Sequence, residues 1–273
     1  GELRPIHHQS SVASAQVKSA ILLAGLFAEG ETSVTEPALS RNHTELMLRA
    51  FGADVRTSGT TAAVVGRPEL TAQQMTVPGD ISSAAYFIVA AIITPNSRIT
   101  VRNTGINPTR TGIIDALQAM GADIQIENVR SEAGEPTADI TAKTSRLFGI
   151  KIAGDLIPRL IDEVPILAVA AAVADGTTII ADAQELRVKE TDRIASVKSE
   201  LSKMGARIEE TQDGMIIRGV PKLTGAVCDS HGDHRIAMSC LIAGLAAEGE
   251  TTVLDTKNIA TSFPGFADLL ASL

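Results

Sequence analysis

Two kinds of segment alternate along the whole chain. The first kind begins with polar residues, continues as an alanine-rich apolar helix, and ends at a Gly or Asn turn before a β-branched strand. It occurs four times, at residues 13–34, 80–101, 161–180 and 234–253. The second kind is a more charged helix that ends in a glycine turn and a strand, at residues 46–55, 113–126 and 200–210. Self-similarity at long intervals indicates repeated supersecondary units, so the sequence predicts an α/β fold of repeated β-α-β-α-β-β modules.

The series of segments begins and ends with the first kind. A protein assembled from whole modules is not expected to open halfway through one, and the first residues, GELRPIHHQSS, read like an internal stretch. We therefore expect further modules upstream of the first helix. The alternative is a complete protein with an odd number of half-modules.

The charge and composition exclude several classes of partner. The net charge is −8, only 3% of the residues are aromatic, and there is no Trp, whereas nucleic-acid binding needs a basic field or stacking platforms. No run of 18 apolar residues is present to cross a membrane, and the first residues do not resemble a secretory signal. Cys228 and Cys240 lack metal-site spacing and are expected to be reduced, buried thiols of a cytoplasmic protein. An anionic ligand therefore needs a local cluster of cations.

Such a cluster occurs at residues 186–194, LRVKETDRI. Helical spacing follows it, in Ile194, Val197, Leu201 and Met204. A helix that begins near Lys189 would place Lys189 and Arg193 on one face, where like charges repel by roughly 0.2–0.5 kcal/mol and where the helix dipole also disfavours cations. Either nearby carboxylates neutralise the two cations, or the cations bind an anion.

Seven motifs of this chain are typical of one enzyme family: ASAQVKSAILLAGL, SRNHTE, GDISSAAYF, LIDEVPILAVAAA, ELRVKETDR, GDHRIAM and IATSFPGF. With these motifs the chain resembles the 5-enolpyruvylshikimate-3-phosphate synthase (EPSP synthase) family of enolpyruvyl transferases. The resemblance runs over the whole chain and covers roughly the C-terminal two-thirds of a family member. It is strongest to the bacterial subgroup with Ser-Ala-Gln at the phosphate-binding helix.

The resemblance implies an inside-out α/β barrel fold. Two similar domains consist of modules with helices inside and sheets outside, and the substrates bind between the domains. Residues 1–91 would be the remaining part of the domain that binds shikimate 3-phosphate, whose upstream modules are missing. Residues 92–273 would form the second domain, which carries the phosphoenolpyruvate-binding and catalytic residues.

The implied reaction transfers the enolpyruvyl group of phosphoenolpyruvate to the 5-hydroxyl of shikimate 3-phosphate and releases phosphate, in aromatic amino-acid biosynthesis in the cytoplasm. The substrates carry two phosphates and two carboxylates, so several cations must converge. A base must take the hydroxyl proton, an acid must protonate the methylene carbon, and preorganised charge must stabilise the intermediate. No metal or cofactor is implied. The expected partners are the two substrates and the missing N-terminal segment, with no nucleic acid and no membrane.

For shikimate 3-phosphate the resemblance implies eight binding residues: Ser14, Ala15, Gln16, Ser40, Arg41, Asp162, Glu185 and Lys189. Ser14 stands at the start of a helix, where free N–H groups suit a phosphate; the alternative is a plain N-cap. Ala15 replaces a second phosphate-binding Ser of other members, and Ser40 together with Arg41, a bidentate donor, would make up that contact. Glu185 stands where other members have Asn.

Three residues are implied to be catalytic: Asp162, Lys189 and Glu190. Asp162 would be the partner of the 5-hydroxyl, Lys189 would lie near the reacting hydroxyl and the bridging oxygen, and Glu190 would donate a proton to the methylene carbon. The alternative for Asp162 is a helix N-cap, and for the charged stretch it is a solvated helix start with ion pairs such as Glu185–Lys189. Lys18, expected at the surface or the cleft edge, does not replace the missing upstream cations. The chain alone is therefore expected to be inactive.

For phosphoenolpyruvate the resemblance implies Arg193 and Arg235, and it places Thr261 where some members have a binding Lys. Asp233 is interpreted as an N-cap or as a partner of a binding residue, and His234 as a structural or orienting residue. Two other functions stay open. One is the sister transferase that acts on UDP-N-acetylglucosamine, and the other is a non-catalytic split subunit or fragment.

Overall fold

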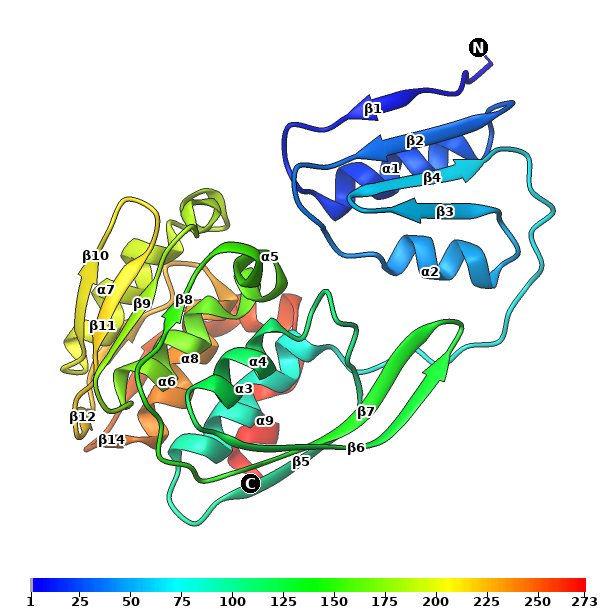
Figure 1. Cartoon of the computed structure of the whole chain (residues 1–273). Helices are drawn as coiled ribbons and strands as arrows, with labels where there is room; N and C mark the ends of the chain where they lie inside the picture. The colour runs from blue at the N-terminus through cyan, green and yellow to red at the C-terminus, as the bar shows by residue number, and fades with distance from the viewer. Residues whose placement is uncertain (1) are drawn as a thin grey trace.

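The computed structural model describes residues 2–273, which fold into two units of unequal size (Figure 1). The small unit, drawn from blue to cyan, ends with strand β4, and the large unit begins with helix α3. Residues 66–80 connect the two units without a helix or a strand. Within residues 2–273, no helix is both long and apolar enough to cross a membrane.

The small unit is a four-stranded sheet packed against two helices. The strand order is β1-β2-β4-β3, in which β1 pairs with β2 in parallel and the other neighbours pair antiparallel. One small core, with Leu22 and Leu48 from the two helices, lies between helices and sheet. The elements are β1 His7–Gln9, α1 Ala15–Gly25, β2 Glu31–Thr35, α2 His43–Ala50, β3 Val55–Ser58 and β4 Thr61–Val65.

Three mainly apolar helices lie at the centre of the large unit and contact one another: α3 (Ile81–Ile93), α6 (Val164–Ala172) and α8 (His234–Leu245). Because α3 and α6 are apolar on every side, they are stable only when they are buried on every side. Almost every residue of α3 and all of α6 is buried in one core. The helices therefore form the inside of this unit.

Sheets and charged helices lie outside these three helices (Figure 1). One sheet has the order β5-β7-β6 and another has the order β10-β11-β9-β8. Short pairs join β12 to β14 and β13 to β15. The elements are β5 Arg98–Gly105, α4 Gly112–Ala119, β6 Asp123–Glu132, β7 Glu135–Lys143, β8 Lys151–Ile152, α5 Ile157–Leu160, β9 Thr177–Ile180, α7 Arg193–Lys203, β10 Arg207–Glu210, β11 Met215–Arg218, β12 Leu223–Thr224, β13 Val227–Asp229, β14 Ala247–Glu248, β15 Thr252–Leu254 and α9 Phe266–Ala271.

The predicted alternation of segments is present in the structure. Each of the four apolar segments contains a helix followed by a strand, and so does each of the three charged segments. The arrangement of helices inside and sheets outside is also confirmed. The periodicity and the β-branched strands of the sequence were sufficient to predict the alternation of segments, whereas the inside-out arrangement was implied by the family resemblance.

The boundary between the units differs from the expected one. A boundary after residue 91 falls inside α3, whose side chains pack in the core of the large unit. The two cores are instead separated by residues 66–80. The physical reason is that α3 has no polar face, and only the large core can surround it.

Candidate active site

One carboxylate, that of Asp162, lies among three guanidinium groups. It belongs to the 3-10 turn Ile161–Glu163 that leads into α6, and 14% of its side chain is exposed. Its Oδ2 accepts a hydrogen bond from Nη2 of Arg41 at 2.8 Å and lies 3.6 Å from Nη1 of Arg110. Its Oδ1 lies 3.7 Å from Nη1 of Arg193. Arg41 belongs to the small unit, so this ion pair joins the two units.

The charges around Asp162 favour its ionised form. Burial alone would raise the pKa of Asp162, but the positive charges of Arg235, Arg41, Arg110 and Lys189 outweigh burial and lower this pKa below its ordinary value. An ionised carboxylate can accept a hydrogen bond from a hydroxyl group and can take its proton. The N-cap position of α6 is Glu163, and none of the side chains of residues 2–273 caps that helix. The alternative reading of Asp162 as a helix cap is therefore wrong.

The neighbouring carboxyl, Glu163, has a different environment. It is fully buried, the hydroxyl of Ser82 donates a hydrogen bond to its Oε1, and Nη2 of Arg110 lies 3.3 Å from the same oxygen. Burial raises the pKa of Glu163, and the charge of Arg110 offsets this only in part. Adjacent carboxyls whose pKa values move in opposite directions are typical of functional sites. The sequence analysis gave no role to Glu163, Ser82 or Arg110.

The predicted helix start in LRVKETDRI is wrong by one turn. Helix α7 begins at Arg193, with Asp192 as its N-cap, and Lys189 lies before it in extended conformation after the 3-10 turn Gln184–Val188. Lys189 and Arg193 therefore do not share a helix face. The buried Arg193 donates from Nη2 to Glu190 at 2.5 Å, so a local carboxylate does neutralise one of the two cations.

Asp233 connects the ends of two helices. Its Oδ1 accepts a hydrogen bond from the backbone N–H of Arg235 at 2.8 Å and so caps α8, and its Oδ2 accepts one from Nε of Arg193 at 2.8 Å. Burial opposes ionisation, but Arg193 outweighs it and lowers the pKa of Asp233. The N-cap interpretation of Asp233 is confirmed.

On the small unit, Ser14 is the N-cap of α1, as its alternative reading predicted. Its Oγ accepts a hydrogen bond from Val17 N–H at 3.4 Å, which leaves its hydroxyl hydrogen available for a ligand. The Ser14 N–H donates to Glu36 Oε1 at 2.9 Å, and the Ser40 hydroxyl donates to Glu36 Oε2 at 2.8 Å. Glu36 thus ties together Ser14 and Ser40. Gln16 is exposed beside them.

Lys18 is not at the surface or the cleft edge, as the sequence analysis expected. Only 2% of its side chain is exposed, and Nζ forms ion pairs with Glu36 at 3.0 Å and with Glu45 at 2.9 Å. A buried cation is tolerated when carboxylates compensate its charge. Position within a helix did not reveal these two partners, which lie later in the sequence.

Two predicted binding residues lie apart from the Asp162 cluster. Thr261 is exposed at the end of the 3-10 turn Thr256–Thr261, and its hydroxyl donates to the Asn258 carbonyl at 2.6 Å. Glu185 is also exposed, and its Oε1 is 3.7 Å from Nζ of Lys189. This pair was predicted as part of a solvated helix start. Among residues 2–273 no group of three or more His, Cys, Asp or Glu side chains is arranged to hold a metal ion.

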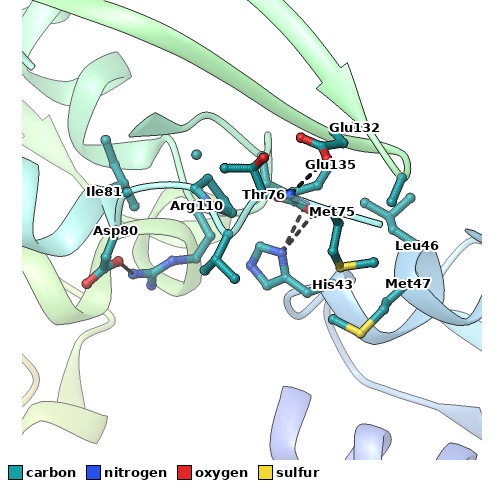
Figure 2. A pocket seen from close by; sticks show the side chains of 16 residues that line it. His43, Leu46, Met47, Met75, Thr76, Asp80, Ile81, Arg110, Glu132 and Glu135 are labelled. Atoms are coloured by element: carbon teal, nitrogen blue, oxygen red, sulfur yellow. Dashed lines mark hydrogen bonds and ion pairs between the residues drawn. The ribbon is translucent and has the colours of Figure 1, made fainter. Parts of the chain in front are cut away.

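A pocket of about 320 Å³ lies where the two units meet (Figure 2). His43, Leu46 and Met47 of α2 form one wall, and the connecting segment and the end of the β6–β7 hairpin form the others. Glu135 on this hairpin contacts Nδ1 of His43 at 3.1 Å. Arg110 lies at one end of the pocket beside Asp80 (Figure 2). The hairpin therefore provides a second link between the units, besides Arg41–Asp162.

Comparisons with known proteins agree on one family. Residues 1–270 match the family described as EPSP synthase (3-phosphoshikimate 1-carboxyvinyltransferase). The 3-phosphoshikimate 1-carboxyvinyltransferase of Desulforamulus reducens is 57% identical over 99% of this chain and 63% of its own length. That of Desulforudis audaxviator is 57% identical over 100% of this chain and 64% of its own length.

Comparison of the fold with solved structures indicates the same family. A solved structure of EPSP synthase from Acinetobacter baumannii is similar with a TM-score of 0.93 and 49% sequence identity, over 99% of this chain and 63% of that chain. The chain thus spans about 63% of the length of the relatives that it matches.

Proposed function

The chain belongs to the EPSP synthase family, and from this we propose that it supplies the larger part of an enzyme that transfers the enolpyruvyl group of phosphoenolpyruvate to the 5-hydroxyl of shikimate 3-phosphate. The observation that carries the proposal is Asp162, an ionised carboxylate that faces Arg41 of the small unit and Arg110 and Arg193 of the large unit. Two anionic substrates need such a convergence of cations.

The small unit supports binding of the shikimate phosphate. Within residues 2–273 the Ser14 hydroxyl donates to no acceptor, and it stands at the N-terminus of an eleven-residue helix, where backbone N–H groups and the helix dipole favour an anion. The hydroxyl hydrogen of Ser40 is donated to Glu36, so Ser40 must rotate before it can donate to a phosphate. Arg41 is 38% exposed and can turn from Asp162 to the phosphate. We assign Ala15 and Gln16 to the same site.

The large unit supports binding of phosphoenolpyruvate and the proton transfers. Arg193 and Arg235 would hold the phosphate and carboxylate of this substrate, and the incoming anion would compete with Glu190 for Arg193. Glu190, released from that ion pair, is the proposed proton donor to the methylene carbon. Asp162 would take the proton of the 5-hydroxyl, and Lys189 would stabilise charge at the bridging oxygen.

Residues at the margin of the site have weaker support. Glu185 reaches the site only through its contact with Lys189. Thr261 is exposed, and its place in the site rests on the family resemblance alone. The two cysteines are buried and free of disulfide, which is consistent with a cytoplasmic location.

Phosphate release tests the proposal. The chain alone, and a chimera in which it replaces the matching 64% of the Desulforudis audaxviator relative, are incubated with both substrates. We expect turnover by the chimera and none by the chain alone, because further cations are expected in the part of the relative that this chain does not match. A folded chimera without turnover would overturn the proposed function, and turnover by the chain alone would remove the need for the other part. UDP-N-acetylglucosamine in place of shikimate 3-phosphate should give no turnover.

A further inference from the structure

Arg110 is held rigidly on one side of its guanidinium group. It lies on the loop before α4, and 8% of its side chain is exposed. Nη2 donates a hydrogen bond to Ser82 Oγ at 2.5 Å and lies 3.3 Å from Glu163 Oε1. Asp80, at the start of α3, lies 3.8 Å from the same nitrogen. Two segments of the large unit, the start of α3 and the turn before α6, therefore fix this side chain.

The second terminal nitrogen of this guanidinium group, Nη1, differs from Nη2. Nη1 of Arg110 is buried and has no hydrogen-bond partner among residues 2–273. A buried donor without a partner costs free energy, and each such group in a folded protein needs an explanation. The nearest charged acceptor is Asp162 Oδ2 at 3.6 Å, too far for a hydrogen bond. Nη1 thus carries an unused donor close to the central carboxylate of the site.

The same oxygen is already occupied by Arg41, whose Nη2 donates to Asp162 Oδ2 at 2.8 Å. The two arginines differ in their freedom to move. Arg41 is 38% exposed and follows Ser40 in the other unit, whereas Arg110 is almost completely buried and anchored. If Arg41 turns to an anionic ligand, Oδ2 loses its hydrogen bond, and Arg110 is the cation that can replace it with the least movement.

We propose that Arg110 is a positioning residue for Asp162, and that its Nη1 takes over Asp162 Oδ2 when an anionic ligand draws Arg41 away. The identity of that ligand as shikimate 3-phosphate rests on the proposed function. The replacement of Arg41 by Arg110 as hydrogen-bond donor to Asp162 Oδ2, called the handover below, does not. Asp162 is faced by charged groups from several elements: Arg41, Arg110, Arg193, Arg235, Lys189 and Glu163. Among its four arginines, Arg110 is the one assigned to no substrate anion, so it can keep Asp162 ionised and in place while both substrates are bound.

A crystal structure of the Arg41→Gln variant of this chain tests the handover directly, because this substitution removes the competing guanidinium. We expect the distance from Arg110 Nη1 to Asp162 Oδ2 to shorten from 3.6 Å to hydrogen-bond length, about 2.7–3.2 Å. A distance that stays at 3.6 Å or increases would overturn the proposal.

Titration of the Asp162 carboxyl carbon by ¹³C NMR gives a second readout, with the signal assigned by its loss in Asp162→Asn. Loss of a neighbouring cation raises a carboxyl titration midpoint by about one pH unit or more. We expect a shift of that size for Arg110→Gln, a smaller one for Arg41→Gln because Arg110 compensates, and for the double variant a shift larger than the sum of the two. Additive shifts, or no shift for Arg110→Gln, would contradict the handover.

Arg159→Gln is the matched control. Nε of Arg159 donates to the Pro108 carbonyl at 2.7 Å and Nη2 donates to Asp115 at 2.6 Å. Arg159 thus supports the loop that carries Arg110 but does not reach Asp162, and its loss should leave the Asp162 midpoint unchanged. If Arg110→Gln does not fold, because it leaves Glu163 buried without a counter-charge, the variant Arg110→Gln/Glu163→Gln is titrated against Glu163→Gln instead.

The chimera separates this inference from the proposed function. In an active chimera, Arg110→Gln should move the acidic limb of the kcat/KM profile to higher pH by about one unit, and Arg159→Gln should not move it. An inactive wild-type chimera would contradict the proposed function, but the crystal structure of Arg41→Gln would still test the handover. An active chimera whose acidic limb does not move in Arg110→Gln would sink the role of Arg110 alone.

Discussion

Asp233 holds Arg193 through a single hydrogen bond, from Nε to Oδ2 at 2.8 Å, while its other oxygen caps the helix that begins next to it. Both side chains are almost fully buried. The two arginines assigned to phosphoenolpyruvate, Arg193 and Arg235, are thus placed by one carboxylate. Their spacing is set by Asp233 and not by contact between two cations.

Substitution of Asp233 by Asn should separate the two functions of this side chain, which are to cap α8 and to compensate the charge of Arg193. Asn is as good an N-cap as Asp, so the cap of α8 is retained, but the charge that compensates the buried Arg193 is lost. We expect the free energy of unfolding, measured by urea denaturation of this chain, to fall by about 2 kcal/mol. In the chimera, KM for phosphoenolpyruvate should rise by about tenfold or more, with KM for shikimate 3-phosphate nearly unchanged. An equal rise of both KM values would contradict a specific link to Arg193.

Lys189→Met should lower the rate of the chimera without destabilising it. Lys189 is half-buried and its pair with Glu185 at 3.7 Å lies near the surface, so its loss should change the free energy of unfolding by less than about 1 kcal/mol. Removal of a positive charge where negative charge develops should lower kcat by about 10²–10³-fold. Lys198→Met is the control, because Lys198 on α7 pairs with Glu210 at the surface, 3.6 Å away. An unchanged kcat for Lys189→Met would show that the assigned role is wrong.

The buried charges of the small unit give a prediction about stability. Lys18→Met leaves Glu36 and Glu45 buried without their cation. Removal of one partner of a buried ion pair costs about 3–5 kcal/mol, so urea denaturation should show early unfolding of the small unit. The variant Lys18→Met/Glu36→Gln/Glu45→Gln, which removes all three charges, should recover much of this loss. Lys222→Met, which breaks an exposed pair with Glu248, should cost less than about 1 kcal/mol.

The fold could be predicted from the sequence because its main signal is local. Helices such as α3 and α6 are apolar on every side, and each is followed by a turn and a β-branched strand. The position of the boundary between the two units could not be predicted from the sequence, since it depends on which core encloses α3. The same limit applies to the site. The motifs led to the prediction of Asp162, Arg193 and Arg41, which the structure brings close together. The contacts of Lys18 and Arg110 involve partners distant in the sequence, Glu45 and Asp162.

Glu200 links stability to pH. Burial works against its charged form, but hydrogen bonds from Lys203 at 2.6 Å, the Asp229 N–H at 2.7 Å and His231 at 2.8 Å outweigh burial and lower the pKa of Glu200 to about 2. The folded-state pKa lies below the unfolded value of 4.5. The stabilisation is therefore fully present above about pH 4.5 and is lost as the pH falls toward 2.

The Glu200→Gln variant tests this pH dependence, because Gln does not ionise and its contribution to stability should not change between pH 5 and pH 2. The wild-type chain should lose roughly 3 kcal/mol more unfolding free energy than Glu200→Gln between pH 5 and pH 2, measured by urea denaturation at each pH. Glu209→Gln is the matched control, because Glu209 pairs with Arg218 at an exposed position on β10 and should leave the pH dependence unchanged. Parallel pH curves for the wild type and Glu200→Gln would mean that the three donors do not stabilise the ionised carboxylate. The hydrogen bonds of Asp229 and His231 to Glu200 hold the segment just before Asp233. Their loss in Glu200→Gln should therefore also raise KM for phosphoenolpyruvate in the chimera.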